Sequence, residues 1–161
     1  KYPAIHPLDS WSKYKSVIRP DWVEYGRSYL KNGTDVESMM KVVGEEGTSL
    51  DDFIVYLKGN FLDSVYLQQN SFDEVDAAAD VERQTYVYKA ILKVLGSNFE
   101  LNTKDEARTY FNQLRQKFID WNYSVWQSDD FKKLESEIDS LYSEKSGKLE
   151  SKASLLLKEG E

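Results

Sequence analysis

The chain has 161 residues, a length that suffices for one hydrophobic core. Its 28 acidic and 21 basic side chains give a formal charge of −7. It contains no cysteine and a single histidine, so disulfide frameworks, thiolate nucleophiles and histidine-rich metal centres are excluded, and no metal site is expected. The acidic balance disfavours a nucleic-acid partner, and no apolar run approaches the roughly 18 to 20 residues that insertion across a membrane requires.

The first residues, KYPAIHPLDSWSKY, form a proline-bracketed aromatic segment. Prolines fix φ and restrict the residue before them, which favours an extended path that presents Tyr2. The segment has no initiator methionine, so we expect residues 1–20 to be a connector from a preceding part of a longer protein. His6 has no nucleophile or metal partner near it in sequence, and a structural role is expected for it.

The next stretch predicts three helices. The first starts after Pro20 and stops at the Asn32-Gly33 pair, and the second stops at Gly44. A third starts at a Ser49 cap and continues through Gly59. Apolar residues at helical spacing are expected to be buried in the second and third helices: Val36, Met39, Met40, Val43, Ile54, Leu57, Phe61 and Val65.

The second half favours long helices. One is expected from a cap at Asp80 to Gly96, and another from a Thr103-x-x-Glu106 capping box to Val125. A last helix, with Phe131, Leu134, Ile138 and Leu141 at helical spacing, pairs with it and frays near Gly147. Strand signals are almost absent. The predicted fold class is all-α: an antiparallel helical bundle over residues 21–161, preceded by the connector and ending in a long C-terminal helical hairpin.

No residues here are expected to be catalytic for phosphoryl transfer. The phosphate-binding pattern GxxxxGK[ST] does not occur, and the nearest glycine pair, Gly44 and Gly47, is too closely spaced and lacks the lysine. A second reading starts from the carboxylates Asp120, Asp129 and Asp130 near Trp126, which resemble the acid pair of a glycosidase. Clustering in sequence does not set their separation in space, so this hydrolase reading stays open.

Two segments carry a resemblance to a known family. The segment Tyr2 to Tyr14 resembles the connector by which rotary ATPase subunits enter their C-terminal helical domain. YLQQNSFDEVD at Tyr66 to Asp76 resembles the FLQQNAFDEVD phrase of the catalytic A subunit of V-type and archaeal-type ATPases, and YVYKAIL at Tyr86 to Leu92 continues it. HPLDS at His6 to Ser10 is nearer to the F-type beta-subunit wording. The resemblance implies the C-terminal helical domain of a catalytic A subunit.

The resemblance also implies an adenine site. Tyr2 matches an aromatic that packs on the adenine ring, and Phe72 matches a second aromatic that closes the same pocket; an aromatic face suits a purine face. Gln69 and Asn70 carry amides that can hydrogen-bond the base edge, although an amide-rich turn also forms without any ligand.

An acidic turn, VVGEEGTSLDDF, resembles the lever of rotary ATPases that contacts the central rotor, with Glu45, Glu46, Asp51 and Asp52 at its tip. An acidic tip would attract a basic shaft in a salt-dependent way. Helix capping and the helix dipole explain acids at this position equally well, so a purely structural role for these acids remains an alternative to rotor contact.

The expected function is therefore that of a C-terminal domain that closes on nucleotide and presses on the rotor, coupling ATP hydrolysis or synthesis to proton or sodium transport. Its partners would be its own nucleotide-binding domain, the non-catalytic B subunit and the central stalk. ATP or ADP with Mg²⁺ would be bound in the intact subunit, and the 161-residue piece alone would be inactive. The expected location is cytoplasmic, peripheral to the membrane. The alternative is a stand-alone helical interaction module.

Overall fold

The computed structural model describes residues 19–67 and 77–159. In chain order these residues form α2 (Pro20–Val43), α3 (Leu50–Leu62), the π-helical turn η2 (Asp63–Leu67), α5 (Ala77–Gly96), β1 (Ser97–Phe99), α6 (Lys104–Tyr123), α7 (Asp129–Lys145), β2 (Ser146–Leu149) and α8 (Ser151–Glu159). Helices account for most of the described chain, which confirms the all-α prediction. The connector predicted for residues 1–20 lies almost entirely outside the described residues.

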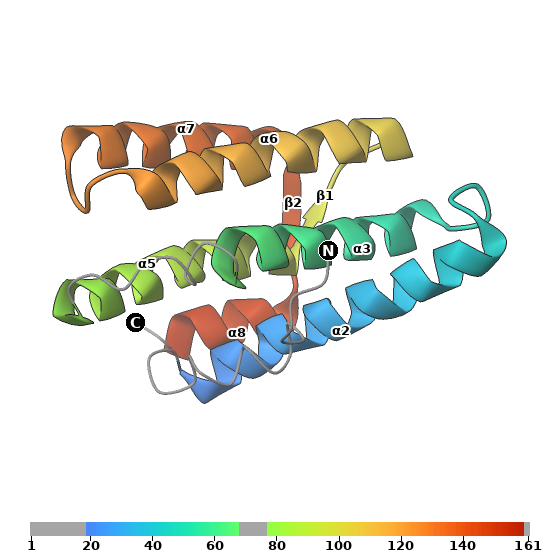
Figure 1. Ribbon diagram of the computed structural model, residues 1–161, viewed down its shortest axis with the longest axis horizontal. Helices are drawn as coiled ribbons and strands as arrows, with labels where there is room; N and C mark the ends of the chain where they lie inside the picture. Colours follow the sequence, from blue (N-terminus) through green and yellow to red (C-terminus); the bar gives the residue numbers. More distant parts are fainter. Residues whose placement is uncertain (1–18, 68–76, 160–161) are drawn as a thin grey trace.

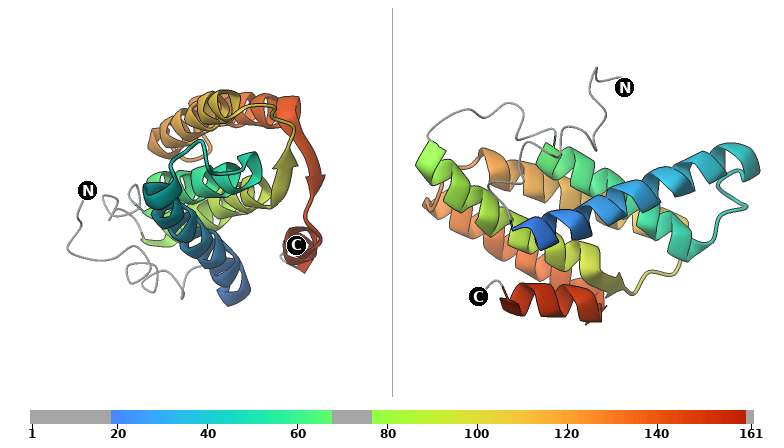
Figure 2. Two further views of the ribbon diagram at one scale, coloured as in Figure 1. Left: turned by 90° about the vertical axis from the view of Figure 1, so that its right-hand side faces the viewer. Right: turned by 90° about the horizontal axis from the view of Figure 1, so that it is seen from below.

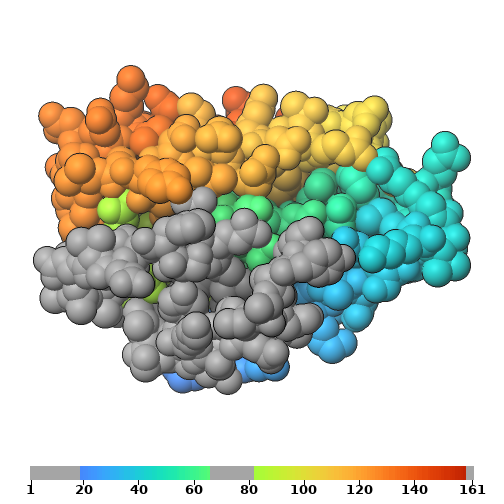
Figure 3. Space-filling model, viewed as in Figure 1, coloured from blue at the N-terminus to red at the C-terminus, as the bar shows by residue number. Residues whose placement is uncertain are grey.

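The helices lie in three tiers (Figure 1). The α6–α7 hairpin forms one outer tier, α3 and α5 lie in the middle, and α2 and α8 form the opposite tier. Seen end-on, β1 and β2 run between the tiers and link α5 to α6 and α7 to α8 (Figure 2). In the space-filling view, the turn that joins α2 to α3 lies at one end of the molecule, beyond most of the other elements (Figure 3).

Helix α2 corrects one prediction. Pro20 is its first residue, a position where the missing proline N–H costs nothing. The helix then runs through the Asn32-Gly33 pair without a break, so the two predicted N-terminal helices are one. Gly33 is buried against α3, where a Cβ atom would lie 3.3 Å from the Cα of Gly59. This close contact between the two helices compensates the low helix propensity of glycine.

The C-terminal half of α2 corrects a second prediction. Met39 and Val43, expected in the core, are 37% and 51% exposed, and Val42 is 84% exposed. Only Val36 and Met40 are partly buried. The helix extends past the body of the bundle toward the α2–α3 turn (Figure 1), so its last turns have little to pack against.

The predicted helix starts are confirmed at two caps. The Ser49 hydroxyl accepts a hydrogen bond from the N–H of Asp52 at 3.1 Å, and the Thr103 hydroxyl accepts one from the N–H of Glu106 at 3.0 Å. The carboxylate of Glu106 reaches the N–H of Asn102, which completes a variant of the capping box. Helix α5 begins at Ala77, three residues before the predicted cap, and α6 ends at Tyr123, two residues early.

The core is aromatic. Phe61 of α3 is 1% exposed and packs edge-to-face on Phe118 of α6, with ring centroids 5.0 Å apart. Trp121 and Phe131 join α6 to α7 at 5.0 Å, so the predicted hairpin shares the main core. Edge-to-face pairs add to the hydrophobic term roughly 0.5–1.5 kcal/mol each.

A two-stranded sheet and a last helix were not predicted. β1 and β2 pair antiparallel, with Ser97 opposite Leu149 and Phe99 opposite Ser146. The chain was expected to fray near Gly147, but α8 follows and buries Ala153, Leu156 and Leu157. The indole Nε1 of Trp22 donates to the carbonyl of Leu156 at 3.1 Å, which fixes α8 against α2. Tertiary contacts therefore order a polar segment that lacks strong local signals.

A lysine is buried where α3 meets the end of α5. Lys58 is 6% exposed, and its Nζ donates to the carbonyls of Leu95 and Ser97, each at 2.8 Å. The ammonium group also lies 5.4 Å from the centroid of the Tyr29 ring. Burial lowers the pKa of Lys58 to about 8, opposed by the nearby charge of Glu150. The lysine thus satisfies one carbonyl in the last turn of α5 and one at the first residue of β1.

Candidate functional site

The α2–α3 turn is the best-defined candidate among the described residues. Helix α2 ends at Val43 because Gly44 adopts a φ of 81°, in the left-handed region that favours glycine. The Thr48 N–H then donates to the carbonyl of Glu45 at 3.0 Å, and the Thr48 hydroxyl donates to the carbonyl of Gly44 at 3.0 Å. Thr48 is buried, and both of its hydrogen bonds join it to residues of the same turn, so these bonds stabilise the turn.

The four predicted contact residues, Glu45, Glu46, Asp51 and Asp52, are all exposed at this turn. Asp51 and Asp52 lie in the first turn of α3, where free backbone N–H groups stabilise negative charge. The α2–α3 turn and the start of α3, which carry the four acids, lie at one end of the molecule (Figure 1).

The acids differ in their surroundings. Glu45 accepts a hydrogen bond from Nη2 of Arg108 in α6 at 2.7 Å, and this contact raises the pKa of Arg108. The sequence pattern did not identify Arg108, since it lies 63 residues from Glu45. No signal in the sequence could have linked the two positions.

Exposed apolar side chains adjoin the acids. Val42 and Val43 at the end of α2 are 84% and 51% exposed and directly precede Gly44. An exposed apolar patch beside charged groups is typical of a contact surface. Sequence reasoning placed Val43 in the core, because apolar spacing on a helix indicates a face but not what covers it.

The structure does not describe the residues that were predicted to bind adenine. Tyr2, Gln69, Asn70 and Phe72 lie outside the described residues, as does His6. Their roles remain predictions from the resemblance.

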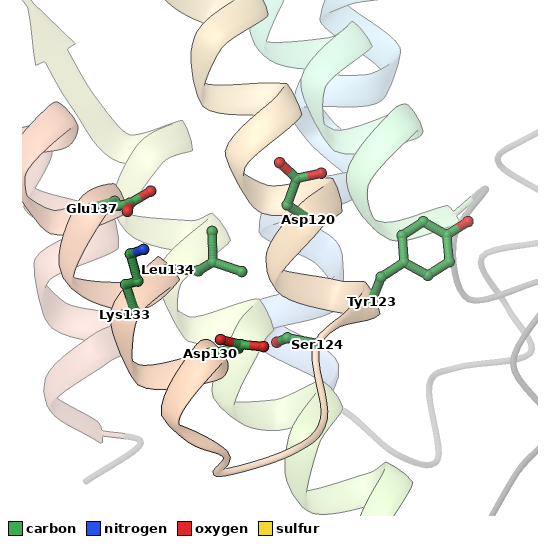
Figure 4. Close-up of a pocket in the computed structure, with 7 residues that line it drawn as sticks. All are labelled: Asp120, Tyr123, Ser124, Asp130, Lys133, Leu134 and Glu137. Atoms are coloured by element: carbon green, nitrogen blue, oxygen red, sulfur yellow. The ribbon is translucent and has the colours of Figure 1, made fainter.

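Two of the three carboxylates that suggested a hydrolase line one groove of the helical hairpin. A groove of about 440 Å³ lies between the end of α6 and the start of α7, with Asp120 from α6 and Asp130 from α7 on its sides (Figure 4). Its lining is Asp120, Tyr123, Ser124, Asp130, Lys133, Leu134 and Glu137. Asp129 is absent from the lining, and Trp126 packs instead on Phe131 at 5.0 Å between ring centroids. The Trp126 ring is partly buried against the core and does not line this groove.

Two further features bear on function. Across residues 19–67 and 77–159, the side chains form no cluster of three or more acids and histidines that could hold a metal ion. Within the same ranges, every helix is too short or too polar to cross a membrane.

Comparison with known proteins gives one matching family and several similar proteins. Residues 12–105 match the family described as the C-terminal domain of V and A type ATP synthase. The chain is 59% identical over 159 residues to the V-type ATP synthase alpha chain of Treponema denticola, covering 99% of this chain and 27% of that protein. It is 56% identical over 153 residues to V-type ATP synthase alpha chain 1 of Treponema pallidum, covering 95% of this chain and 26% of that protein.

A third relative is the V-type ATP synthase alpha chain of Borreliella burgdorferi, 52% identical over 141 residues, with 88% of this chain and 24% of that protein covered. The chain thus spans about a quarter of the length of these curated relatives. No solved structure matches it. The family match covers more than half of the sequence, from before α2 to the first turn of α6, and on this evidence the chain belongs to the family of C-terminal domains of V- and A-type ATP synthases.

Proposed function

We propose that this chain works as the C-terminal part of a catalytic A subunit and couples ATP hydrolysis or synthesis to proton or sodium transport by contacting a rotor. The observation that carries the proposal is the acidic α2–α3 turn, which is exposed at the end of the hairpin formed by α2 and α3. Family membership and relatives named V-type ATP synthase alpha chain support it.

The mechanical role follows from the shape of the hairpin. Helices α2 and α3 are packed against each other through Gly33 and Gly59, so a force at the turn acts on the domain as a whole. Rotation of the domain with bound nucleotide would move the turn against a shaft, and movement of the shaft would move the domain. A basic shaft would be attracted to the exposed acids and would make apolar contact with Val42 and Val43.

The remaining parts of the proposal rest on the resemblance. Tyr2 and Phe72 would pack on the adenine of ATP or ADP, with Gln69 and Asn70 at the base edge. The preceding nucleotide-binding domain would hold the phosphates and Mg²⁺, and a non-catalytic B subunit and a central stalk would be the partners. The 161-residue chain alone would hydrolyse no ATP, because it lacks a phosphate-binding loop. The assembly would place it on the cytoplasmic side, peripheral to the membrane.

The alternative of a stand-alone interaction module is not favoured. A relative that matches 99% of this chain is itself about four times longer and is named an alpha chain of V-type ATP synthase.

The rotor role is tested in the assembled complex with the full-length subunit. The triple variant E46Q/D51N/D52N removes three exposed charges with little change of shape. We expect slower ATP-driven rotation at low ionic strength and a flatter dependence on salt, since screening has less charge left to act on. Rotation with the same rate and the same salt dependence as the unmodified complex would refute the acidic contact.

A further inference from the structure

The start of α6 reaches across to the acidic turn. Nη2 of Arg108 donates to Oε1 of Glu45 at 2.7 Å, and Nη1 donates to Asp105 one helical turn earlier at 2.6 Å. The same guanidinium lies 5.1 Å from the centroid of the Phe53 ring, in the first turns of α3. One side chain therefore contacts the turn, α3 and its own helix.

The backbone of the turn is held from the same side. Nζ of Lys104, the first residue of α6, donates to the carbonyl of Glu45 at 2.5 Å. That carbonyl also accepts the Thr48 N–H, the hydrogen bond that closes the turn. Both the side chain and the main chain of Glu45 are thus bound to the body of the domain.

The other three acids are not bound in this way. Glu46, Asp51 and Asp52 are exposed and form no ion pair with any other described residue. The arginine that faces the turn is already shared between Glu45 and Asp105. The four carboxylates therefore divide into one that faces the chain itself and three that face outward.

We propose that Arg108 is a positioning residue for the acidic turn. It holds Glu45 against α6 and sets the direction in which Glu46, Asp51 and Asp52 point toward a basic partner. Force applied at the turn then passes into the α6–α7 hairpin through this contact as well as along α2 and α3. The role of Arg108 in force transfer rests on the proposed rotor contact, whereas the contact between Arg108 and Glu45 does not.

A double-mutant cycle on the chain tests the contact. The variants are E45Q, R108Q and E45Q/R108Q, and the measurement is amide hydrogen exchange of residues 47–52. E45Q removes one exposed ion pair, and R108Q removes that pair together with the pair to Asp105, so exchange should accelerate by roughly two- to five-fold. The double variant should exchange no faster than R108Q alone, because R108Q has already removed the contact that E45Q removes.

Matched controls separate this contact from general loss of charge. E46Q removes the same charge one residue later, and R115Q removes a guanidinium two turns along α6; neither should change the exchange rates of these amides beyond the neighbouring residue. R108K keeps the charge but loses the forked geometry, and it should restore only part of the protection. Additive effects of E45Q and R108Q, or no effect of either, would overturn the proposal.

A second measurement tests force transfer in the assembled complex. R108Q should lower the maximal rate of ATP-driven rotation without changing KM for MgATP, and R115Q should change neither. An unchanged maximal rate, together with a coupled exchange cycle, would overturn the positioning role while leaving the contact in place. A coupled cycle with no effect of E46Q/D51N/D52N on rotation would instead count against the rotor contact itself.

Discussion

The buried lysine offers the sharpest test of the structure, because its effect on stability changes with pH. In Lys58→Met a side chain of similar length keeps the packing, but the carbonyls of Leu95 and Ser97 lose their shared donor. Two hydrogen bonds from a charged group are worth about 1.5–3 kcal/mol each. Against this, the lowered pKa of Lys58 means that burying its charge costs about 3 kcal/mol. At neutral pH the variant should therefore be destabilised by only about 0–3 kcal/mol.

The sign of the pH effect follows from the same pKa. Lys58 loses its proton near pH 8 in the folded chain, but only near its ordinary value of 10.5 in the unfolded chain. Between these values the unfolded state binds more protons, so the stability of the unsubstituted chain rises by about 1.4 kcal/mol per pH unit. The neutral amine still has two N–H donors for the two carbonyls. From about pH 7 to about pH 9.5, the advantage over Lys58→Met should grow by about 2 kcal/mol.

Urea unfolding followed by circular dichroism at several pH values provides the assay. Lys132→Met, which removes an exposed lysine, should show no such growth. The range stops below pH 10, because burial raises the pKa of Tyr25 and Tyr29 and stability falls again where unfolded tyrosines ionise. A stability difference that is constant or shrinks as the pH rises would show that the pKa of Lys58 is not lowered, and the reasoning would be wrong.

Three further substitutions probe helix contacts. Gly59→Ala places a methyl group 3.1 Å from the carbonyl oxygen of Tyr29, so α2 and α3 must move apart; urea unfolding should show a loss of about 1–3 kcal/mol, and an unchanged midpoint would contradict the close contact. Thr103→Ala removes the hydroxyl that caps α6 and should cost about 0.5–2 kcal/mol, whereas Thr103→Ser should retain most of the stability; equal losses in both would exclude capping as the cause. Trp22→Phe removes the donor to the carbonyl of Leu156 and should speed amide exchange in α8 more than in α6, and uniform acceleration would argue against a local anchor.

Much of the helical order could be predicted because its signals are local. The hydroxyl caps at Ser49 and Thr103 and the stops at Gly44 and Gly96 lie within a few residues of the backbone groups they affect. The break predicted at Gly33 was wrong, because a glycine that ends a helix and one that admits a neighbouring helix look the same in sequence.

Only part of the candidate site could be predicted from the sequence. The acidic turn was visible in the sequence, since four carboxylates surround a turn between two predicted helices. Its binding to Arg108 was not visible, and neither was the exposure of Val43. Each depends on which parts of the chain lie beside the turn, and short-range patterns contain no information about that.

The sequence by itself determined the all-α class, the hairpins and most helix ends of this ATP synthase domain, because hydrophobic spacing and capping act over one or two turns. Only the tertiary structure decided that α2 is continuous, that β1 pairs with β2, and that α8 folds back onto Trp22. It also decided that Lys58 is buried beside the end of α5. These features join positions far apart in the chain, and their free energy appears only once the bundle has brought the partners together.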